Sequence, residues 1–317
     1  MNVKARLPDD VDLFIDIAIN VTLPIVSIAA LGYLMQSRIN LDVPSMNRLL
    51  MFVIMPCFLI HFLSSARQPV SEIWPVAYFT VVQFLVLIPV GWLAAMAFGL
   101  PRIFGPLFAM ATVYANVGNY GIPLVQLAFP PQFILHQSVI TALMTILMVT
   151  VGAWLLAPTQ DRSGFLSRIK MAFETPVIPA VILGLSLRAF EVQLPHAVST
   201  PIELLGSTFP PLALFALGAQ LAGRTAGEVA IGRLSIVLLL KLMIAPAVTW
   251  ALASFMGMPD DLTDLLVVAA ATPIGVLLAL FCADYGREPK FVNSAILIST
   301  VLSPFTVTGW VMLTRLY

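Results

Sequence analysis

Long apolar runs separated by short polar connectors dominate the chain. About 20 residues are needed to cross the hydrocarbon core of a bilayer, and ten runs come close to or exceed that length. Their predicted limits are 13–36, 46–65, 73–98, 104–129 and 133–157, then 172–190, 201–222, 231–256, 262–284 and 291–315. Pro and Gly inside several runs do not exclude them, since neighbouring helices can satisfy the freed backbone groups. The pattern predicts an all-α polytopic membrane protein with ten transmembrane helices.

The distinctly hydrophilic segment 158–170 divides these runs into five and five. We expect a first five-helix repeat over 1–157, a cytoplasmic connector over 158–170 and a second repeat over 171–317. An odd number of spans makes the second repeat enter the membrane from the opposite side, so the repeats are inverted. Three spacings recur in the same order in both halves: Pro24 and Gly32 with Pro176 and Gly184, Leu50 and Pro56 with Leu205 and Pro211, and Gln83 and Trp92 with Lys241 and Trp250.

The basic residues of the connectors set the orientation. With the N-terminus outside, ten Lys and Arg residues fall in inside connectors and five in outside ones, with Lys241 set aside. Positive charge accumulates on the cytoplasmic side. We therefore expect a multi-pass protein of the cytoplasmic (inner) cell membrane with both termini outside.

Composition agrees with this class and excludes others. Hydrophobic residues make up 60% of the chain, charged residues 10%, and the mean hydropathy is +0.98. A formal net charge of zero leaves no basic face for nucleic acid. Cys57 and Cys282 lie inside apolar runs, which argues against a disulfide or a metal site. The sequence lacks HExxH, GxSxG and glycine-rich phosphate-binding motifs, so we expect neither an enzyme nor an ATP-driven pump. No cofactor is expected, while coupling to Na⁺ or H⁺ stays open.

Two short segments break membrane-length runs: Ala115–Pro123 and Ala271–Gly275. Such breaks are tolerated only where protein or a wet cavity replaces the lost backbone partners, and paired breaks in two halves are typical of a transporter site. We expect Gly121 to cap one half-helix, and Thr272 to cap the other with Pro273 at its first position. Two helix N-termini meeting near the midplane would attract a carboxylate. The alternative is two kinks filled by Ser, Thr and water. The predicted substrate-binding residues are Asn116, Gly118, Asn119, Tyr120, Gly121, Pro123, Thr272, Pro273, Ile274 and Gly275.

Lys241 is the one basic residue deep inside a run, about nine residues from its start. A buried ammonium is costly unless it is paired or loses its proton. We predict that Lys241 belongs to the substrate site, as a counter-charge for an anion or as a stand-in for a bound cation; the alternative is a structural lysine bonded to carbonyls of a broken helix. Gln83 is its neutral counterpart in the first half. Pro56 and Pro211 lie inside their runs at matching places, where they either kink a helix or line the pathway.

These motifs resemble the auxin efflux carrier family, which includes plant auxin exporters and bacterial carriers assigned to malonate, malate and similar acids. The resemblance covers essentially the whole chain. The residues that support it are Asn116 with Gly121-Ile122-Pro123-Leu124, Leu31-Gly32-Tyr33, Leu49 to Pro56, and Ala270 to Pro273. The chain lacks the long hydrophilic central loop of the plant members and has Thr272-Pro273 where an Asn is usual.

The resemblance implies a scaffold domain and a transport domain in which the fourth and ninth helices break and cross, with elevator-like motion. It also implies that Asn116, Pro123 and Pro273 frame an anionic substrate. The main hypothesis is a secondary carrier of a small organic anion, probed by a carboxylate panel and by Asn116→Ala. A sodium-coupled, bile-acid-like symporter and a non-transporting sensor or channel of the same fold are the alternatives. A homodimer through the scaffold helices is an open expectation.

Overall fold

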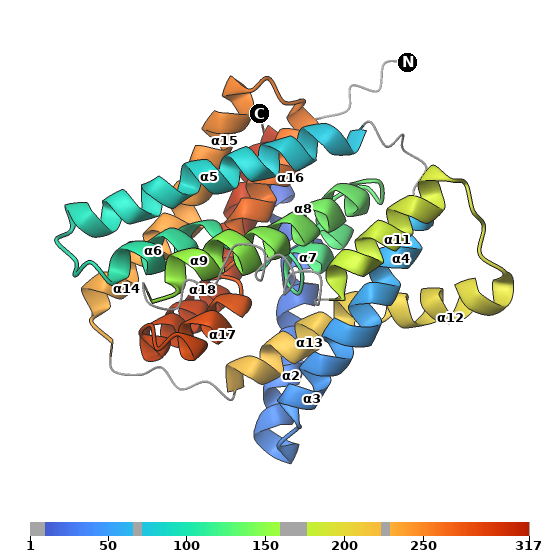
Figure 1. Ribbon diagram of the computed structural model, residues 1–317, viewed down its shortest axis with the longest axis horizontal. Helices are drawn as coiled ribbons and strands as arrows, with labels where there is room; N and C mark the ends of the chain where they lie inside the picture. Colours follow the sequence, from blue (N-terminus) through green and yellow to red (C-terminus); the bar gives the residue numbers. More distant parts are fainter. Residues whose placement is uncertain (1–9, 66–71, 159–175, 223–228, 317) are drawn as a thin grey trace.

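A computed structural model describes residues 10–65, 72–158, 176–222 and 229–316 (Figure 1). Every regular element in these residues is helical, apart from one isolated β-bridge. Nearly all of the predicted connector 158–170 lies outside the described residues.

The first half of the chain forms helices that are partly interrupted by five-residue π-helical turns, labelled η. In order they are α1 (Asp10–Ile17), η1 (Ala18–Thr22), α2 (Leu23–Ile39), α3 (Val43–Leu49), η2 (Leu50–Ile54), α4 (Met55–Ser65), α5 (Ile73–Ala97), α6 (Phe104–Val113), α7 (Gly121–Ala128), α8 (Phe133–Leu147), η4 (Met148–Gly152) and α9 (Ala153–Leu156). The second half repeats this style with α11 (Val177–Ala189), α12 (His196–Ser207), α13 (Phe209–Ala222), α14 (Ile231–Leu239), η6 (Leu240–Ile244), α15 (Ala245–Phe255), α16 (Asp260–Ala271), α17 (Leu277–Asp284) and α18 (Pro289–Leu316).

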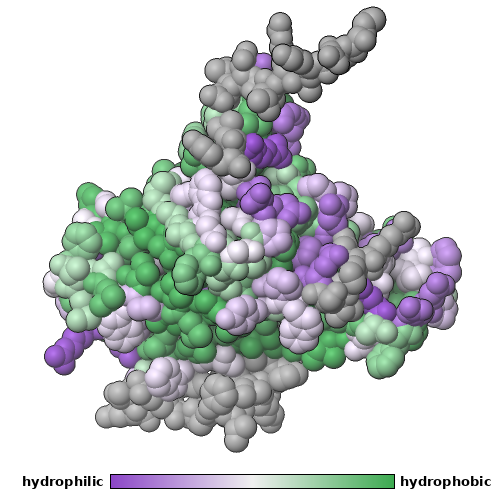
Figure 2. All heavy atoms as spheres, turned by 90° about the horizontal axis from the view of Figure 1, so that it is seen from above, coloured by the Kyte–Doolittle hydropathy of each residue, from purple (hydrophilic) through white to green (hydrophobic). Residues whose placement is uncertain are grey.

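Seven helical stretches in the described part are long and apolar enough to cross a membrane. They correspond to seven of the ten predicted runs: Asp12–Ile39, Val43–Ser65, Ile73–Ala97, Phe133–Leu156, His196–Ala222, Ile231–Phe255 and Pro289–Arg315. Two other runs contain the interrupted pairs α6–α7 and α16–α17, and the remaining one contains α11. Apolar side chains cover much of the face seen in Figure 2, as expected for helices that contact lipid.

Three of the π-helical turns end just before a proline. Pro24, Pro56 and Pro246 each follow such a turn, at the start of α2, α4 and α15. Proline has no N–H and its ring collides with the carbonyl four residues earlier, so the helix widens locally. The freed carbonyl of Leu242, four residues before Pro246, accepts a hydrogen bond from the Trp310 indole N–H at 2.9 Å. A side chain thus replaces the bond that proline removes.

Glycines bring two pairs of helices into backbone contact. α2 crosses α13, and a Cβ on Gly32 would lie 2.0 Å from the Phe215 carbonyl oxygen. α11 crosses α4, where a Cβ on Gly184 would lie 3.3 Å from the Cα of Ile60 and from the Leu59 carbonyl oxygen. Small residues at such crossings are the usual device for close packing of helices in lipid.

An apolar cluster joins α1, η1 and α2 to α7, α16 and α18. Its buried members include Ile17, Val21, Ile25, Leu124, Val267, Ala271, Val307 and Val311. One ion pair lies beside it in the described part, between Asp16 and Arg315 at 3.9 Å. The first and last helices are therefore adjacent.

Candidate functional site

The two predicted breaks lie directly against each other. Ala115 and Ile274 form an isolated antiparallel β-bridge. The Asn116 amide donates to the Pro273 carbonyl at 2.8 Å, and the Gly275 amide donates to the Tyr114 carbonyl at 3.0 Å. Each break supplies the backbone partners that the other has lost, as a chain interrupted at membrane depth requires.

The first break is a tight turn organised by the backbone of Asn116. Its carbonyl accepts hydrogen bonds from the amides of Gly121 at 2.9 Å and Tyr120 at 3.3 Å. α7 begins at Gly121, with Tyr120 at the N-cap position, so the predicted cap is displaced by one residue. Pro123 lies in the first turn, as predicted.

The second break differs from the sequence prediction. Thr272 does not begin a half-helix; it ends α16, with its hydroxyl donating to the Ala269 carbonyl at 2.8 Å. The reason is Pro273, because a residue before proline is driven out of the helical region, and Thr272 has an extended ψ of 153°. α17 starts only at Leu277, after Val276 at the N-cap. The Ile274 amide donates to the Ser299 hydroxyl of α18 at 3.2 Å.

Between the Ala115–Ile274 bridge and the two half-helices, five backbone amides have no acceptor among the described residues. They precede or open the two half-helices: Val117, Gly118, Asn119, Val276 and Leu277. The partial positive charge of each half-helix N-terminus lies at the same place. Unpaired amides with this polarity favour a bound anion.

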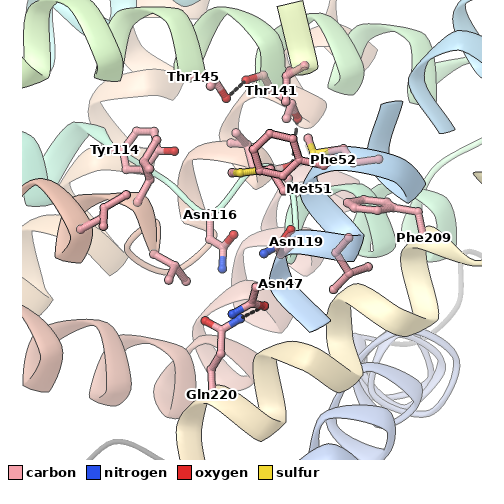
Figure 3. Close-up of a pocket in the computed structure, with 18 of the residues that line it drawn as sticks. Asn47, Met51, Phe52, Tyr114, Asn116, Asn119, Thr141, Thr145, Phe209 and Gln220 are labelled. Carbon is pink, nitrogen blue, oxygen red and sulfur yellow. Dashed lines mark hydrogen bonds between the residues drawn. The ribbon is translucent and has the colours of Figure 1, made fainter. Parts of the chain in front are cut away.

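A cavity of about 420 Å³ opens beside these amides (Figure 3). This volume lies in the range of roughly 300–1,000 Å³ that suits small-molecule ligands. Its apolar wall comes from η2 and the start of α4, from α13 and from α17; its polar side chains come from the first break and from α3, α8 and α13. The lining residues include Leu50, Met51, Phe52, Met55, Phe209, Val276, Leu277 and Leu280, and the polar Asn47, Arg48, Asn116, Asn119, Thr141, Thr145 and Gln220.

Asn116 presents an unused donor at this cavity. Its side chain is 6% exposed, and its Nδ2 has no hydrogen-bond partner in the described part. Figure 3 shows the side chains of Asn116 and Asn119 directed toward Asn47 and Gln220. Gln220 Nε2 donates to Asn47 Oδ1 at 2.9 Å, so these two side chains hold each other in place.

Side chains of helix α8 hold the backbone of the first break by hydrogen bonds. Gln137 Nε2 and the Thr141 hydroxyl both donate to the Val117 carbonyl, at 2.7 and 3.1 Å. Thr145 lies one turn further along and donates to the Thr141 carbonyl at 2.8 Å. This stripe fixes the orientation of the turn that carries the free amides.

The predicted site residues divide into three groups. Asn116, Gly118 and Asn119 line the cavity. Pro273, Ile274 and Gly275 build the crossing, and Thr272 and Gly121 end and begin the half-helices. Tyr120 is buried in the apolar cluster with Leu124, beside Pro123 in α7. Substrate contact by any of them stays a prediction.

Lys241 is not among the residues that line the large cavity. It is 1% exposed and its Nζ donates to the Ala270 carbonyl at 3.1 Å. With Gln83 it lines a separate cavity of about 10 Å³, which approximates the space of one water. Gln83 Nε2 also donates to the Thr249 hydroxyl at 2.7 Å. Gln83, the predicted counterpart of Lys241 in the first half, thus lines the same small cavity as Lys241.

Both predicted hinge prolines lie at helix interruptions. Pro56 follows η2, whose residues line the large cavity. Pro211 lies in the first turn of α13, just after the interruption at Thr208. Met55 and Phe209, one and two residues away, reach the cavity.

The predicted site residues did not include Asn47, Arg48, Gln220 or the α8 stripe. The stripe had a detectable signal, because Gln137, Thr141 and Thr145 repeat every four residues and so share one face of a helix. Asn47 and Gln220 are polar residues near run ends, and only the fold brings them to the cavity.

Apolar helices of membrane length, two crossed and broken helices, and a cavity that combines an apolar wall with a few polar side chains define an integral membrane protein of the transporter class. The chain belongs to the membrane transport protein family, whose model matches residues 17–311. The resemblance to auxin efflux carriers is thereby confirmed.

Similar proteins agree with this assignment. A Rhizobium meliloti (strain 1021) protein, provisionally named as a malonate transporter, is 24% identical over 312 residues, which cover 92% of this chain and 94% of the relative. Auxin efflux carrier component 2 of Arabidopsis thaliana is 26% identical over 136 residues, or 41% of this chain and 21% of the relative. Auxin efflux carrier component 3a of Oryza sativa subsp. japonica is 27% identical over 139 residues, or 42% and 22%. The matches to these two plant carriers span about a fifth of their length.

Proposed function

We propose that the protein is a secondary active carrier that moves a small organic anion, a carboxylate, across the cytoplasmic membrane. The observation that carries this proposal is the backbone bridge between Ala115 and Ile274, with the 420 Å³ cavity beside it. A site built from two broken helices at membrane depth is the arrangement used by carriers with inverted repeats.

The chemistry at the crossing favours an anion. The free amides of Val117, Gly118 and Asn119 and the Nδ2 of Asn116 are donors. Among the described residues that line the cavity, none is acidic. A carboxylate offers up to four acceptor positions and would satisfy several of these donors at once.

The paired helix contacts support two inverted five-helix repeats in a ten-helix protein. In the predicted repeats, α2 corresponds to α11, and α12–α13 to α3–α4. The glycine contacts follow that exchange: Gly32 of α2 meets α13, and Gly184 of α11 meets α4. In our proposal these helices form the scaffold, while α5 to α9 and α14 to α18 form a transport domain that moves as an elevator.

The position of Lys241 bears on ion coupling. Its ammonium donates to the Ala270 carbonyl in the last turn of α16, where the helix dipole is negative and favours a cation. We propose that Lys241 stands in for a bound cation there. If the lysine replaces a coupling cation, transport should not require Na⁺, so the dependence of transport on Na⁺ and on pH is measured separately.

The test is flux into proteoliposomes. Purified protein is reconstituted and a panel of mono- and dicarboxylates, with malonate included, is tested with and without a Na⁺ or pH gradient. We expect saturable uptake of at least one acid, strongly reduced in Asn116→Ala. Binding without flux would favour a sensor, single-channel currents would favour a channel, and no binding or flux with any acid would contradict the proposal.

Dimerisation through the scaffold helices stays a prediction. α2 exposes Leu23, Leu31 and Leu34 on its surface, which either contact lipid or a second copy. Measurement of the oligomeric state in detergent and in nanodiscs would decide between them.

A further inference from the structure

Among the described residues that line the large cavity, one is charged, and that residue is Arg48. It lies in the last turn of α3, and its side chain is exposed. The adjacent wall is apolar, with Leu50, Met51 and Phe52 on the following π-helical turn. A single positive charge beside low-dielectric walls raises the local concentration of anions.

The nearest acid on this element is already engaged elsewhere. Asp42 caps α3 and accepts hydrogen bonds from the hydroxyl and the amide of Ser45, at 2.5 and 3.2 Å. These two bonds, together with a smaller effect of the nearby Arg48 charge, hold the pKa of the Asp42 carboxyl below its usual range, while the carboxylate itself is bonded to Ser45 and makes no ion pair with Arg48 in the described part. No ion pair of Arg48 occurs within the described ranges. Its guanidinium is therefore available to a ligand.

Other donors lie around the same cavity. The Asn116 Nδ2 is buried without a partner, and Asn47, the residue before Arg48, is held by Gln220. In the architecture proposed above, Arg48 belongs to the scaffold and Asn116 to the transport domain. A carboxylate in the cavity can thus be bound from both domains in this conformation.

We propose that Arg48 is the residue that selects anions over neutral molecules, by binding the substrate carboxylate on the scaffold side of the cavity. This inference rests on the proposed function, since it concerns the same cavity. Arginine suits the role because its planar guanidinium bonds a carboxylate with two parallel N–H groups, which a lysine cannot reproduce.

Equilibrium binding tests the proposal without requiring transport. The probes are carboxylates paired with amides of the same shape: malonate with malonamide, and benzoate with benzamide. Wild-type protein should bind at least one carboxylate more tightly than its amide. Arg48→Gln should weaken carboxylate binding by about tenfold, the scale of a hydrogen bond to a charged group, and leave amide binding unchanged. Arg48→Lys should restore part of the loss.

Arg38→Gln is the matched control. Arg38 lies in the last turn of α2, is exposed, and is not part of the cavity wall. Like Arg48→Gln, this substitution removes one positive charge from the last turn of a helix. Equal losses in Arg38→Gln and Arg48→Gln would reduce the effect to general surface charge and overturn the proposal.

The outcomes separate this inference from the carrier function. Flux with unchanged carboxylate selectivity in Arg48→Gln overturns the role of Arg48 and leaves the carrier intact. Selective carboxylate binding that depends on Arg48, with no flux, supports the residue and contradicts the carrier. Wild-type protein that shows no preference for either acid over its amide overturns the role of Arg48.

Discussion

Lys241 donates a hydrogen bond from Nζ to the carbonyl of Ala270 over 3.1 Å, at the last turn of the half-helix α16. The lysine is 1% exposed, and its π-helical turn lies before Pro246. A cationic donor at the negative end of a broken helix stabilises the break electrostatically. The contact places Lys241 at the crossing but outside the lining of the large cavity.

The first prediction concerns this lysine. Lys241→Gln removes the charge but keeps a donor, so the protein should fold while its apparent affinity for a transported carboxylate falls or the pH dependence of transport changes. The reason is that Lys241 holds a carbonyl at the C-terminal end of α16, directly before the chain enters the crossing. Transport is measured across a pH series, with the exposed Lys290→Gln as control. Unchanged transport at every pH would exclude a functional role for Lys241.

Gly275 provides a steric test of the crossing. A Cβ there would lie 2.3 Å from the Tyr114 ring and 3.1 Å from the Ala115 carbonyl oxygen. Gly275→Ala should therefore separate the two breaks and abolish most transport. Gly309→Ala is the control, since a Cβ at Gly309 in α18 meets nothing within 4 Å; the fully helical site should accept alanine with a gain of about 0.5–1 kcal/mol.

A second substitution at Tyr114 should partly reverse the effect of Gly275→Ala. If the Tyr114 ring causes the defect, Tyr114→Ala combined with Gly275→Ala should recover part of the thermal stability lost in the single variant. Normal transport by Gly275→Ala would show that the close contact of the two breaks is dispensable.

Trp310 tests how the widened helix before Pro246 is satisfied. Its indole N–H donates to the Leu242 carbonyl, and Trp310→Phe removes that donor while keeping an aromatic ring. A buried acceptor left without its partner costs about 1–3 kcal/mol. We expect a lower melting temperature in detergent; a melting temperature equal to wild type would mean that another donor reaches Leu242.

Arg315 makes two contacts of unequal value. Its Nη2 donates to the Ala128 carbonyl at the end of α7 at 2.6 Å, and its Nη1 lies 3.9 Å from the carboxylate of Asp16, whose side chain is 59% exposed. Exposed ion pairs contribute about 0–1 kcal/mol, whereas a charged donor on a helix-end carbonyl contributes about 1.5–3 kcal/mol. Arg315→Gln should therefore destabilise the protein more than Asp16→Asn does. Equal losses in thermal denaturation would assign the stabilisation to the ion pair.

Sequence alone predicted where the two helices break and that half-helix N-termini, with their partial positive charge, lie at the breaks. Gly, Asn and Pro inside a membrane-length run have a local meaning, because they remove helical hydrogen bonds wherever the rest of the chain lies. The helical runs followed from hydropathy for the same reason. The start of α17 was predicted wrongly because the capping propensity of Thr272 competes with the restriction that Pro273 imposes on it, and the restriction prevailed.

The cavity wall could not be predicted in this way. Asn47 and Gln220 are 173 residues apart, and each is an ordinary polar residue near the end of an apolar run. Only the crossing of α2 with α13 and the packing of α3 against α13 bring them together. Contacts between distant segments depend on tertiary geometry, whereas hydropathy and periodicity describe only local sequence.

The most direct test of the central claim is hydrogen–deuterium exchange of the purified protein with and without a saturating carboxylate from the transport panel. If the crossing binds the anion, exchange should slow at the amides of Val117 to Asn119 and of Val276 and Leu277, and this protection should be lost in Asn116→Ala. Slower exchange confined to other helices, or in one break without the other, would contradict a site built from both.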